Sequence, residues 1–243
     1  MKQIWKQTWR QRLAAALIQL LMVLAMAGVG IRMPVQAAEK NAVTQSGEMK
    51  VHFLDVGQGL SILAQSEGKT MIYDGGDRKT SRFVVSYLKE HGVSKIDYLI
   101  SSHYDADHMA GLIGCLNAFD VKNVISSNYV HTSKLYQSFV KAVKSDGLKM
   151  QHPAVGKTYK FGRGSFEILA PKTIEAKGSN NNSVAIKLMN GENSFVFTGD
   201  AEHESEAAMC NSSIDLSCDV LVPGHHGSAT ATSWDFLQKT VPE

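Results

Sequence analysis

The chain has 243 residues and a formal net charge of +2. Residues 1–37 contain five cations and no acid, so the remaining 206 residues carry a net charge of −3. This mildly acidic remainder argues against a strongly basic nucleic-acid-binding face. It is long enough to form one sizeable domain.

Residues 1–37 have the pattern of a secretory signal peptide. Basic residues up to Arg12 precede a mostly apolar stretch at 13–31, and small side chains near Ala37 offer a cleavage site. An uncleaved membrane anchor is the alternative, because the apolar stretch is nearly long enough to span a bilayer. We therefore expect a signal peptide or N-terminal anchor at 1–37, a polar linker at 38–48 and a folded domain at 49–243. That domain would be secreted or anchored on the outer face of the cytoplasmic membrane.

The first half of the folded part begins with strands and then alternates strands with helices. Alternating apolar residues and turn residues predict strands at 50–56, 60–64 and 70–73. Helical spacing of apolar residues and the stop at Gly92 predict a helix at 81–91. The same reasoning predicts the elements that follow in chain order: a buried strand at 96–100, a helix at 108–119, a strand at 121–126 and a helix at 132–144.

The second half returns to strands, which are predicted at 158–161, 165–169, 184–188, 194–198 and 220–222. Asn190-Gly191 is a strong signal for a hairpin turn, and a helix is expected at 202–210. Strands, then alternation, then strands again indicate an α/β fold with two mixed sheets flanked by helices. Cys115 fits a small buried apolar residue, whereas Cys210 and Cys218 could close a short loop in an exported protein.

Residues 103–108 read His-Tyr-Asp-Ala-Asp-His and follow the predicted buried strand at 96–100. They place four possible metal ligands within six positions: His103, Asp105, Asp107 and His108. Such density is unfavourable in a core, because buried carboxylates and imidazoles need partners. A strand that ends in a ligand-rich loop therefore indicates a catalytic metal site.

Two further strands run into turns that carry ligands. Residues 195–199 lead into Asp200, and residues 220–224 lead into His225 and His226. Imidazole and carboxylate together suit zinc or manganese. The ligands are too many for one catalytic zinc, which takes about three protein groups. We therefore expect two divalent metal ions, bridged by Asp200.

Asp107 and Asp200 could each have an ordinary structural role instead of binding metal. Asp107 could cap the helix that follows it, and Asp200 could cap the helix near Glu202. The other histidines are expected to be surface or capping groups: His52, His91, His131, His152 and His203. Capping explains neither His103, Asp105 and His108 nor the adjacent pair at 225–226, so we favour the metal site.

These motifs resemble the metallo-β-lactamase superfamily, whose signature is His-x-His-x-Asp-His, here with Asp105 in the second histidine's place. The segments from position 49 onward are similar to the soluble hydrolase domain of the competence protein ComEC and its secreted relatives. They occur in family order: Asp55-Val56-Gly57-Gln58-Gly59, Asp74-Gly75-Gly76, Ser102-His103, Asp105-Ala106-Asp107-His108, Thr198-Gly199-Asp200 and His225-His226-Gly227-Ser228.

The resemblance implies an αββα sandwich and a role for each ligand. His103 and Asp105 would bind one metal, and Asp107 and His108 would bind the other. Asp200 would bridge the two ions, and His225 would be the last histidine ligand. The implied catalytic residues are Asp107 and His226, the latter through a contact with substrate.

Asp55 and Asp74 would orient the metal ligands through hydrogen bonds. Turn chemistry is the alternative for both, because each precedes a glycine-containing turn. The chain departs from the family pattern at 178–183, where no histidine precedes the bridging acid, so the first metal would be weakly held. We also expect the domain to lack its last C-terminal elements, because the related domains continue beyond the His225-His226-Gly227-Ser228 segment.

The expected activity is an exported phosphodiesterase or nuclease in which metal-bound hydroxide attacks phosphorus. Its substrate would be a phosphodiester or phosphate ester, including DNA or a cell-wall polymer, with membrane contact only through the N-terminal segment. A phosphocholine (teichoic-acid) esterase and a lactonase-type hydrolase are alternatives, and β-lactam cleavage is disfavoured by Asp105. The alternative outside the enzymes is a degenerate, non-catalytic exported module.

Overall fold

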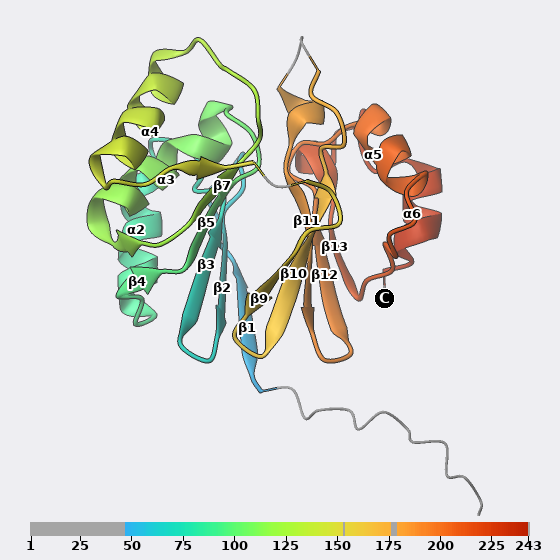
Figure 1. Cartoon of the computed structure of the whole chain (residues 1–243), viewed down its shortest axis with the longest axis horizontal. Helices are drawn as coiled ribbons and strands as arrows, with labels where there is room; N and C mark the ends of the chain where they lie inside the picture. The colour runs from blue at the N-terminus through green and yellow to red at the C-terminus, as the bar shows by residue number, and fades with distance from the viewer. Residues whose placement is uncertain (1–46, 153, 176–178, 243) are drawn as a thin grey trace, which may run out of the picture. The chain divides into compact units, whose positions relative to one another are not determined.

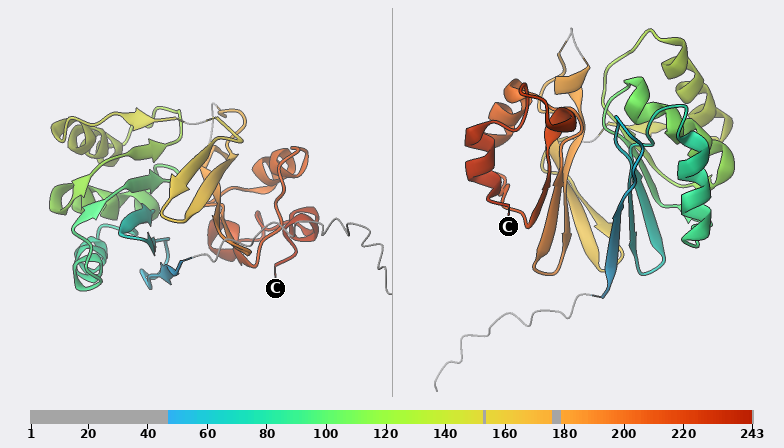
Figure 2. Two further views of the ribbon diagram at one scale, coloured as in Figure 1. Left: turned by 60° about the horizontal axis from the view of Figure 1, so that its bottom comes forward. Right: turned by 180° about the vertical axis from the view of Figure 1, so that it is seen from behind.

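The computed structural model describes residues 47–152, 154–175 and 179–242. Two main sheets pack face to face, and helices cover the outer side of each, which gives four layers (Figures 1 and 2). The expected signal peptide or anchor, and the linker up to residue 46, lie outside the described residues. Within the described ranges, no helix has the length and apolar character needed to cross a membrane.

The first sheet is antiparallel at one edge and parallel at the other. Its strands, in spatial order, are β1 (Met49–Phe53), β2 (Ile62–Ser66), β3 (Lys69–Tyr73), β5 (Tyr98–Ser101), β7 (Val124–Ser126) and β8 (Met150–Gln151). Pairing is antiparallel from β1 to β3 and parallel from β3 to β8. Its outer face carries α2 (Ser81–Glu90), α3 (Ala106–Ala118) and α4 (Lys134–Ser145) (Figure 1).

The second sheet is antiparallel except for the pair of strands at one edge. Its strands, in spatial order, are β13 (Val220–Val222), β12 (Asn193–Phe197), β11 (Ala185–Asn190), β10 (Gly164–Ala170) and β9 (Thr158–Phe161). β12 and β13 run parallel, so their carboxyl ends lie at the same edge of the sheet. The helices on its outer face are α5 (His203–Cys210) and α6 (Trp234–Thr240) (Figure 1).

Two predicted strands are each divided in the structure. The strand expected at 96–100 is β4 (Lys95–Ile96) followed by β5, and that expected at 121–126 is β6 (Asp120–Val121) followed by β7. β4 and β6 pair only with each other. Asp97 lies at the break between β4 and β5. Its N–H donates to the Thr70 carbonyl at 2.8 Å, and its carboxylate accepts the Thr70 N–H at 3.0 Å.

Some element limits also differ from the prediction. The strand expected at 50–56 ends at Phe53. β8 has only two residues, and α6 has seven, so both are too short to show a periodic pattern. The start of α6 is fixed by Ser233, whose hydroxyl accepts the Phe236 N–H at 3.3 Å.

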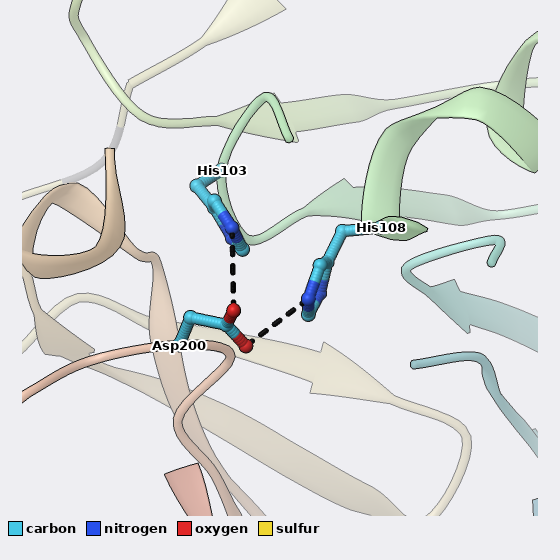
Figure 3. A group of neighbouring side chains, drawn as sticks. All are labelled: His103, His108 and Asp200. Atoms are coloured by element: carbon cyan, nitrogen blue, oxygen red, sulfur yellow. Dashed lines mark ion pairs between the residues drawn. The ribbon is translucent and has the colours of Figure 1, made fainter. Parts of the chain in front are cut away.

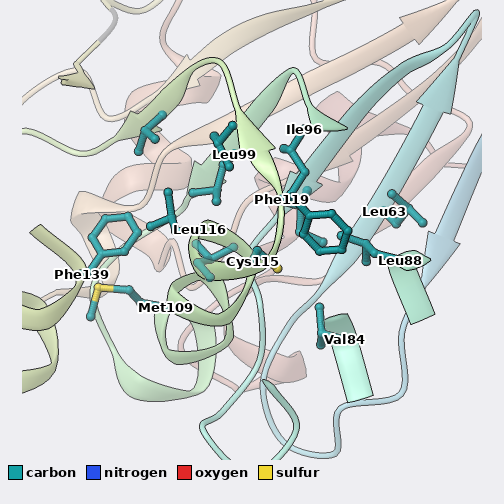
Figure 4. Close-up of a cluster of buried hydrophobic side chains, with 14 of the residues drawn as sticks. Leu63, Val84, Leu88, Ile96, Leu99, Met109, Cys115, Leu116, Phe119 and Phe139 are labelled. Atoms are coloured by element: carbon teal, nitrogen blue, oxygen red, sulfur yellow. The ribbon is translucent and has the colours of Figure 1, made fainter. Parts of the chain in front are cut away.

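Apolar side chains fill the three spaces between the four layers. One cluster lies under α2, α3 and α4 (Figure 4), one between the two sheets, and one under α5 and α6. Cys115 is fully buried in the first cluster as expected, and burial raises its thiol pKa to about 12. Cys210 and Cys218 are free cysteines, so the structure contains no disulfide between them.

A close backbone contact fixes α3 against the turn after β3. The Gly75 N–H donates to the His108 carbonyl at 2.7 Å, and the Gly111 N–H donates to the Gly76 carbonyl at 3.0 Å. A Cβ on Gly111 would lie 1.7 Å from the Gly75 oxygen, so no other residue fits without moving the backbone. This contact brings the start of α3, and His108 with it, beside Asp74.

Candidate metal centre

The candidate ligands meet at one end of the sandwich, where β5, β12 and β13 terminate. β5 leads into His103, β12 leads into Asp200, and β13 leads into a 3₁₀ turn, η2 (Gly224–Gly227), that holds both histidines. In Figure 1 the tight turns between β2 and β3, between β9 and β10, and between β11 and β12 lie at the opposite end. The carboxyl ends of strands are the usual place for ligand sites in α/β sheets.

His103, His108 and Asp200 form the first ligand group and are buried (Figure 3). The Nε2 atoms of His103 and His108 lie 3.7 Å and 3.0 Å from the carboxylate oxygens of Asp200. His103 Nε2 is buried without a hydrogen-bond partner among the described residues. Such atoms normally find partners, so this nitrogen, which faces Asp200, fits a bound ion.

Asp107, His108 and His226 form the second ligand group. The Nε2 atom of His226 lies 3.3 Å from an Asp107 oxygen, 3.2 Å from His108 Nε2 and 3.4 Å from an Asp200 oxygen. The two groups therefore share His108, and Asp200 of the first group also contacts His226 of the second. Nitrogen and carboxylate oxygen donors are the set that zinc and manganese accept.

Asp105 and His225 lie at the edge of these groups. An Asp105 oxygen is 3.7 Å from His103 Nε2, and the Asp105 side chain is 40% exposed. His225 Nε2 is 3.9 Å from Asp200. His225 and His226 both have left-handed backbone angles, with φ of 48° and 56°. Such strained conformations are rare for non-glycine residues and cluster at functional sites.

The capping alternatives for Asp107 and Asp200 do not match the structure. Asp107 lies within the first turn of α3, and the N-cap residue is Asp105, whose side chain makes no capping hydrogen bond. The N-cap of α5 is Glu202, again without a side-chain cap. The carboxylates of Asp107 and Asp200 face the imidazoles instead.

Asp74 and Asp55 have different surroundings. The buried Asp74 carboxylate accepts the Ser102 N–H at 2.7 Å and the Ser102 hydroxyl at 2.6 Å, and lies 2.8 Å from His108 Nδ1. This contact turns His108 Nε2 toward the ligand groups, as expected of a carboxylate behind a metal-binding histidine. Asp55 is exposed, and its carboxylate accepts the Gly57 N–H at 3.1 Å. This hydrogen bond within the turn matches the alternative role given for Asp55.

Two serines with no role predicted from the sequence contact His103, and one of them also contacts Asp200. The Ser102 hydroxyl lies 2.9 Å from His103 Nδ1, and the Ser183 hydroxyl lies 3.4 Å from the same atom. Ser183 also accepts the Asp200 N–H at 3.1 Å. Ser183 follows the 3₁₀ turn η1 (Asn180–Asn182), in the region where the expected histidine is missing.

Glu202 is a further site residue that the sequence did not reveal. Its Oε1 atom lies 3.1 Å from His225 Nδ1 and accepts the Thr230 hydroxyl at 2.8 Å and an Asn180 amide at 3.3 Å. The Glu202 N–H donates to the Asn181 side chain at 2.9 Å. The asparagine turn therefore supports the carboxylate that orients His225. A single acid before a helix gives no sequence signal for this role.

We expect Glu202→Ala to weaken zinc binding by about 10- to 100-fold, because His225 loses the carboxylate that orients its ring. Glu204→Ala is the matched control, since Glu204 lies on the same helix and its carboxylate contacts the amide of Asn181. Competition with a chromogenic chelator measures both affinities. Equal affinities for the two variants would show that Glu202 does not support the ligand set.

The imidazoles of the metal-free site differ in protonation. Burial, together with neighbouring His108, lowers the pKa of His103 to about 3, which keeps it neutral as a ligand must be. Burial alone would lower the pKa of His108, but Asp74 and Asp200 outweigh it and raise the value to about 10. Hydrogen bonds to Asp107 and Asp200 raise the pKa of His226 to about 9.

Metal binding should therefore release protons and tighten as pH rises from 7 to 9. In the metal-free protein, the raised pKa values of His108 and His226 add stability below the unfolded value of 6.5. That stability is lost as pH rises through 9 to 10. A metal ligand must be deprotonated, so titration at pH 7 in two buffers of different ionisation enthalpy should detect proton release. His108→Gln should release about one proton fewer, because His108 is the ligand with the raised pKa. Affinity independent of pH over this range would contradict the assignment.

Comparisons with known proteins agree with this architecture. A family model described as the metallo-β-lactamase superfamily matches residues 54–239. The chain is 27% identical over 217 residues to ComE operon protein 3 of Bacillus subtilis, covering 82% of this chain and 28% of that protein. It is 31% identical over 199 residues to Recombination protein 2 of Haemophilus influenzae, covering 80% and 23%. The chain thus spans about a quarter of the length of these relatives.

Solved structures show the same fold at low sequence identity. The metallo-β-lactamase SMB-1 superposes with a TM-score of 0.51 at 16% identity, over 79% of this chain and 88% of that one. A Cronobacter sakazakii metallo-β-lactamase gives 0.50 at 12% identity, over 70% and 73%. These likenesses concern the fold alone. The family match and the competence-protein relatives show that the chain belongs to the metallo-β-lactamase superfamily, as a ComEC-like domain.

Proposed function

We propose that this domain is a metal-dependent phosphodiesterase that uses two divalent ions, zinc or manganese. The observation that carries the proposal is the pair of ligand groups that share His108, together with the Asp200 carboxylate, which contacts imidazoles of both groups. A carboxylate between two groups can bridge two ions, and paired ions are typical of phosphatases and nucleases. Asp105, in the place of a family histidine, adds an oxygen ligand and favours the harder ion.

The chain's own residues prepare the site for this chemistry. Bound divalent ions would supply Lewis acidity, which lowers the pKa of a coordinated water and stabilises charge on phosphate oxygens. Asp107, His108 and Asp200 would hold one ion, while His103, Asp105 and Asp200 would hold the other, with His225 beside Asp200. His226 and Asp200 both line an open cleft of about 350 Å³. His226 is therefore placed to contact the phosphate oxygens of a bound substrate.

DNA is the substrate we favour. Two of the relatives are named Recombination protein 2, of Haemophilus influenzae, and Competence protein ComA, of Neisseria gonorrhoeae. We further propose that the domain acts outside the cytoplasm, on the strength of the signal-like sequence at 1–37. Fractionation of cells that express the full chain tests this location, and a cytoplasmic domain would contradict it.

The activity is tested with the metal-loaded chain and bis(p-nitrophenyl) phosphate, in zinc and in manganese. We expect turnover that Asp107→Ala abolishes, and two equivalents of metal per chain by elemental analysis. Phosphocholine esters, a lactone and a chromogenic cephalosporin form the comparison set. Absence of phosphodiester turnover with both metals bound, or cleavage confined to another member of the set, would contradict the proposal. A folded chain that binds no metal would instead indicate a non-catalytic module.

A further inference from the structure

The loop Gly57–Gly59 lies directly against the metal centre. The Leu60 N–H donates to the Asp107 carbonyl at 3.2 Å, and a Cβ on Gly59 would lie 2.4 Å from that oxygen. Gly57 and Gly59 have φ of 72° and 125°, conformations that favour glycine. The loop therefore approaches Asp107 as only a glycine-containing segment can, and it holds the exposed Gln58 at the rim of the site.

Two open clefts flank Gln58, which lines both of them. The first, of about 350 Å³, also contains Asp200 and His226. The second, of about 460 Å³, also contains Asp107 and Lys79. Each cleft thus reaches ligand residues of the metal centre. If the reacting phosphate of a substrate lies at that centre, the groups on its two sides would extend one into the first cleft and the other into the second.

The walls of the two clefts suit different chemical groups. Leu60, Val222, Pro223 and glycine backbone line the first, which gives an apolar surface for an uncharged ring. The second contains Lys79, an exposed cation that forms no ion pair within the described part of the chain. Asp77 lines the same cleft, and its carboxylate accepts the Lys79 backbone N–H at 3.1 Å. Exposed Arg78 adds a second cation to this loop.

We propose that the two clefts bind successive units of one nucleic-acid strand, with a nucleoside in the apolar cleft and the next phosphate at Lys79. This inference rests on the proposed phosphodiesterase function and adds the residues that select the substrate. A glycerol-phosphate polymer would also supply a second phosphate, but it has no ring for the apolar cleft. The clefts therefore favour a nucleic-acid strand over a glycerol-phosphate polymer.

The first test compares dinucleotides with and without a second phosphate, using manganese-loaded full chain. We expect a thymidine dinucleotide bearing a 5′- or a 3′-terminal phosphate to exceed unphosphorylated TpT in kcat/KM by about fivefold, the effect of one exposed ion pair. Lys79→Ala should bring this ratio close to one. Lys89→Ala should keep it, since Lys89 is an exposed cation at the far end of α2.

An unchanged ratio in Lys79→Ala would overturn the assignment of the phosphate cleft. Faster cleavage of glycerophosphoryl-glycerol than of TpT would overturn the assignment of the nucleoside cleft. These failures differ from failure of the hydrolase itself, in which the metal-loaded chain would cleave neither TpT nor bis(p-nitrophenyl) phosphate.

A second test measures strand binding without cleavage, using fluorescence anisotropy of labelled oligo-dT. Losing one phosphate contact should reduce the slope of log affinity against log salt by about 0.7 for a single strand. We expect this reduction in Lys79→Ala and the wild-type slope in Lys89→Ala. Equal slopes in both variants would contradict the inference. Lys79-dependent binding without any hydrolysis would contradict the phosphodiesterase proposal and would support only the phosphate contact at Lys79.

Discussion

Asp200→Ala should remove metal from both ligand groups and lower the kcat for bis(p-nitrophenyl) phosphate by at least about 10³-fold. That factor corresponds to roughly 4 kcal/mol, within the range of metal-ion stabilisation of a transition state. We expect this large effect because Asp200 contacts all four site histidines. Its carboxylate oxygens lie 3.0 Å to 3.9 Å from the nearest ring nitrogens of His108, His226, His103 and His225. No other carboxylate among the described residues contacts all four imidazoles. Elemental analysis and steady-state kinetics measure the two losses.

Two further variants separate loss of the site from loss of the fold. Asp200→Asn keeps the shape of the side chain, and the backbone N–H can still donate to Ser183, so we expect a folded protein with weakened metal binding. Asp146→Ala removes an exposed acid at the end of α4 and should leave metal content at two equivalents. Near-normal turnover in a folded Asp200→Ala protein would rule out Asp200 as the bridging ligand.

Asp74→Ala should destabilise the metal-free protein by about 3–5 kcal/mol, the usual cost of removing one partner from a buried charge pair. The carboxylate is fully buried and contacts the Ser102 N–H, the Ser102 hydroxyl and His108 Nδ1. Its loss leaves a buried N–H and a buried imidazole without their acceptor. Zinc affinity should also fall by about 10- to 100-fold, because His108 is no longer oriented.

Asp55→Ala provides the matched control, since Asp55 also precedes a glycine turn but is exposed and contacts only the Gly57 N–H among the described residues. We expect its free energy of unfolding to change by less than about 0.5 kcal/mol. Urea denaturation of the metal-free proteins measures both values. Similar midpoints for Asp74→Ala and Asp55→Ala would show that the buried network does not stabilise the fold.

Much of the fold could be predicted from local pattern. Apolar alternation, helical spacing and glycine turns located α2 to α5 and most strands, because each element buries one face and shows that face in its sequence. The pattern could not show that Asp97 breaks a strand by pairing with Thr70, since that contact joins residues 27 positions apart. It also missed α6, whose seven residues are too few for a period to appear.

The types of the metal ligands, and the strand ends that carry them, follow from the local sequence, because metal chemistry restricts which side chains can serve. The division of these side chains into two ligand groups depends on the folded chain. The tertiary structure placed His108 in both groups, His226 within 3.4 Å of two carboxylates and Asp105 at the edge. It also distinguished Asp74 from Asp55, which have the same local turn context. The physical reason is that burial and orientation depend on contacts between distant segments, which local sequence does not record.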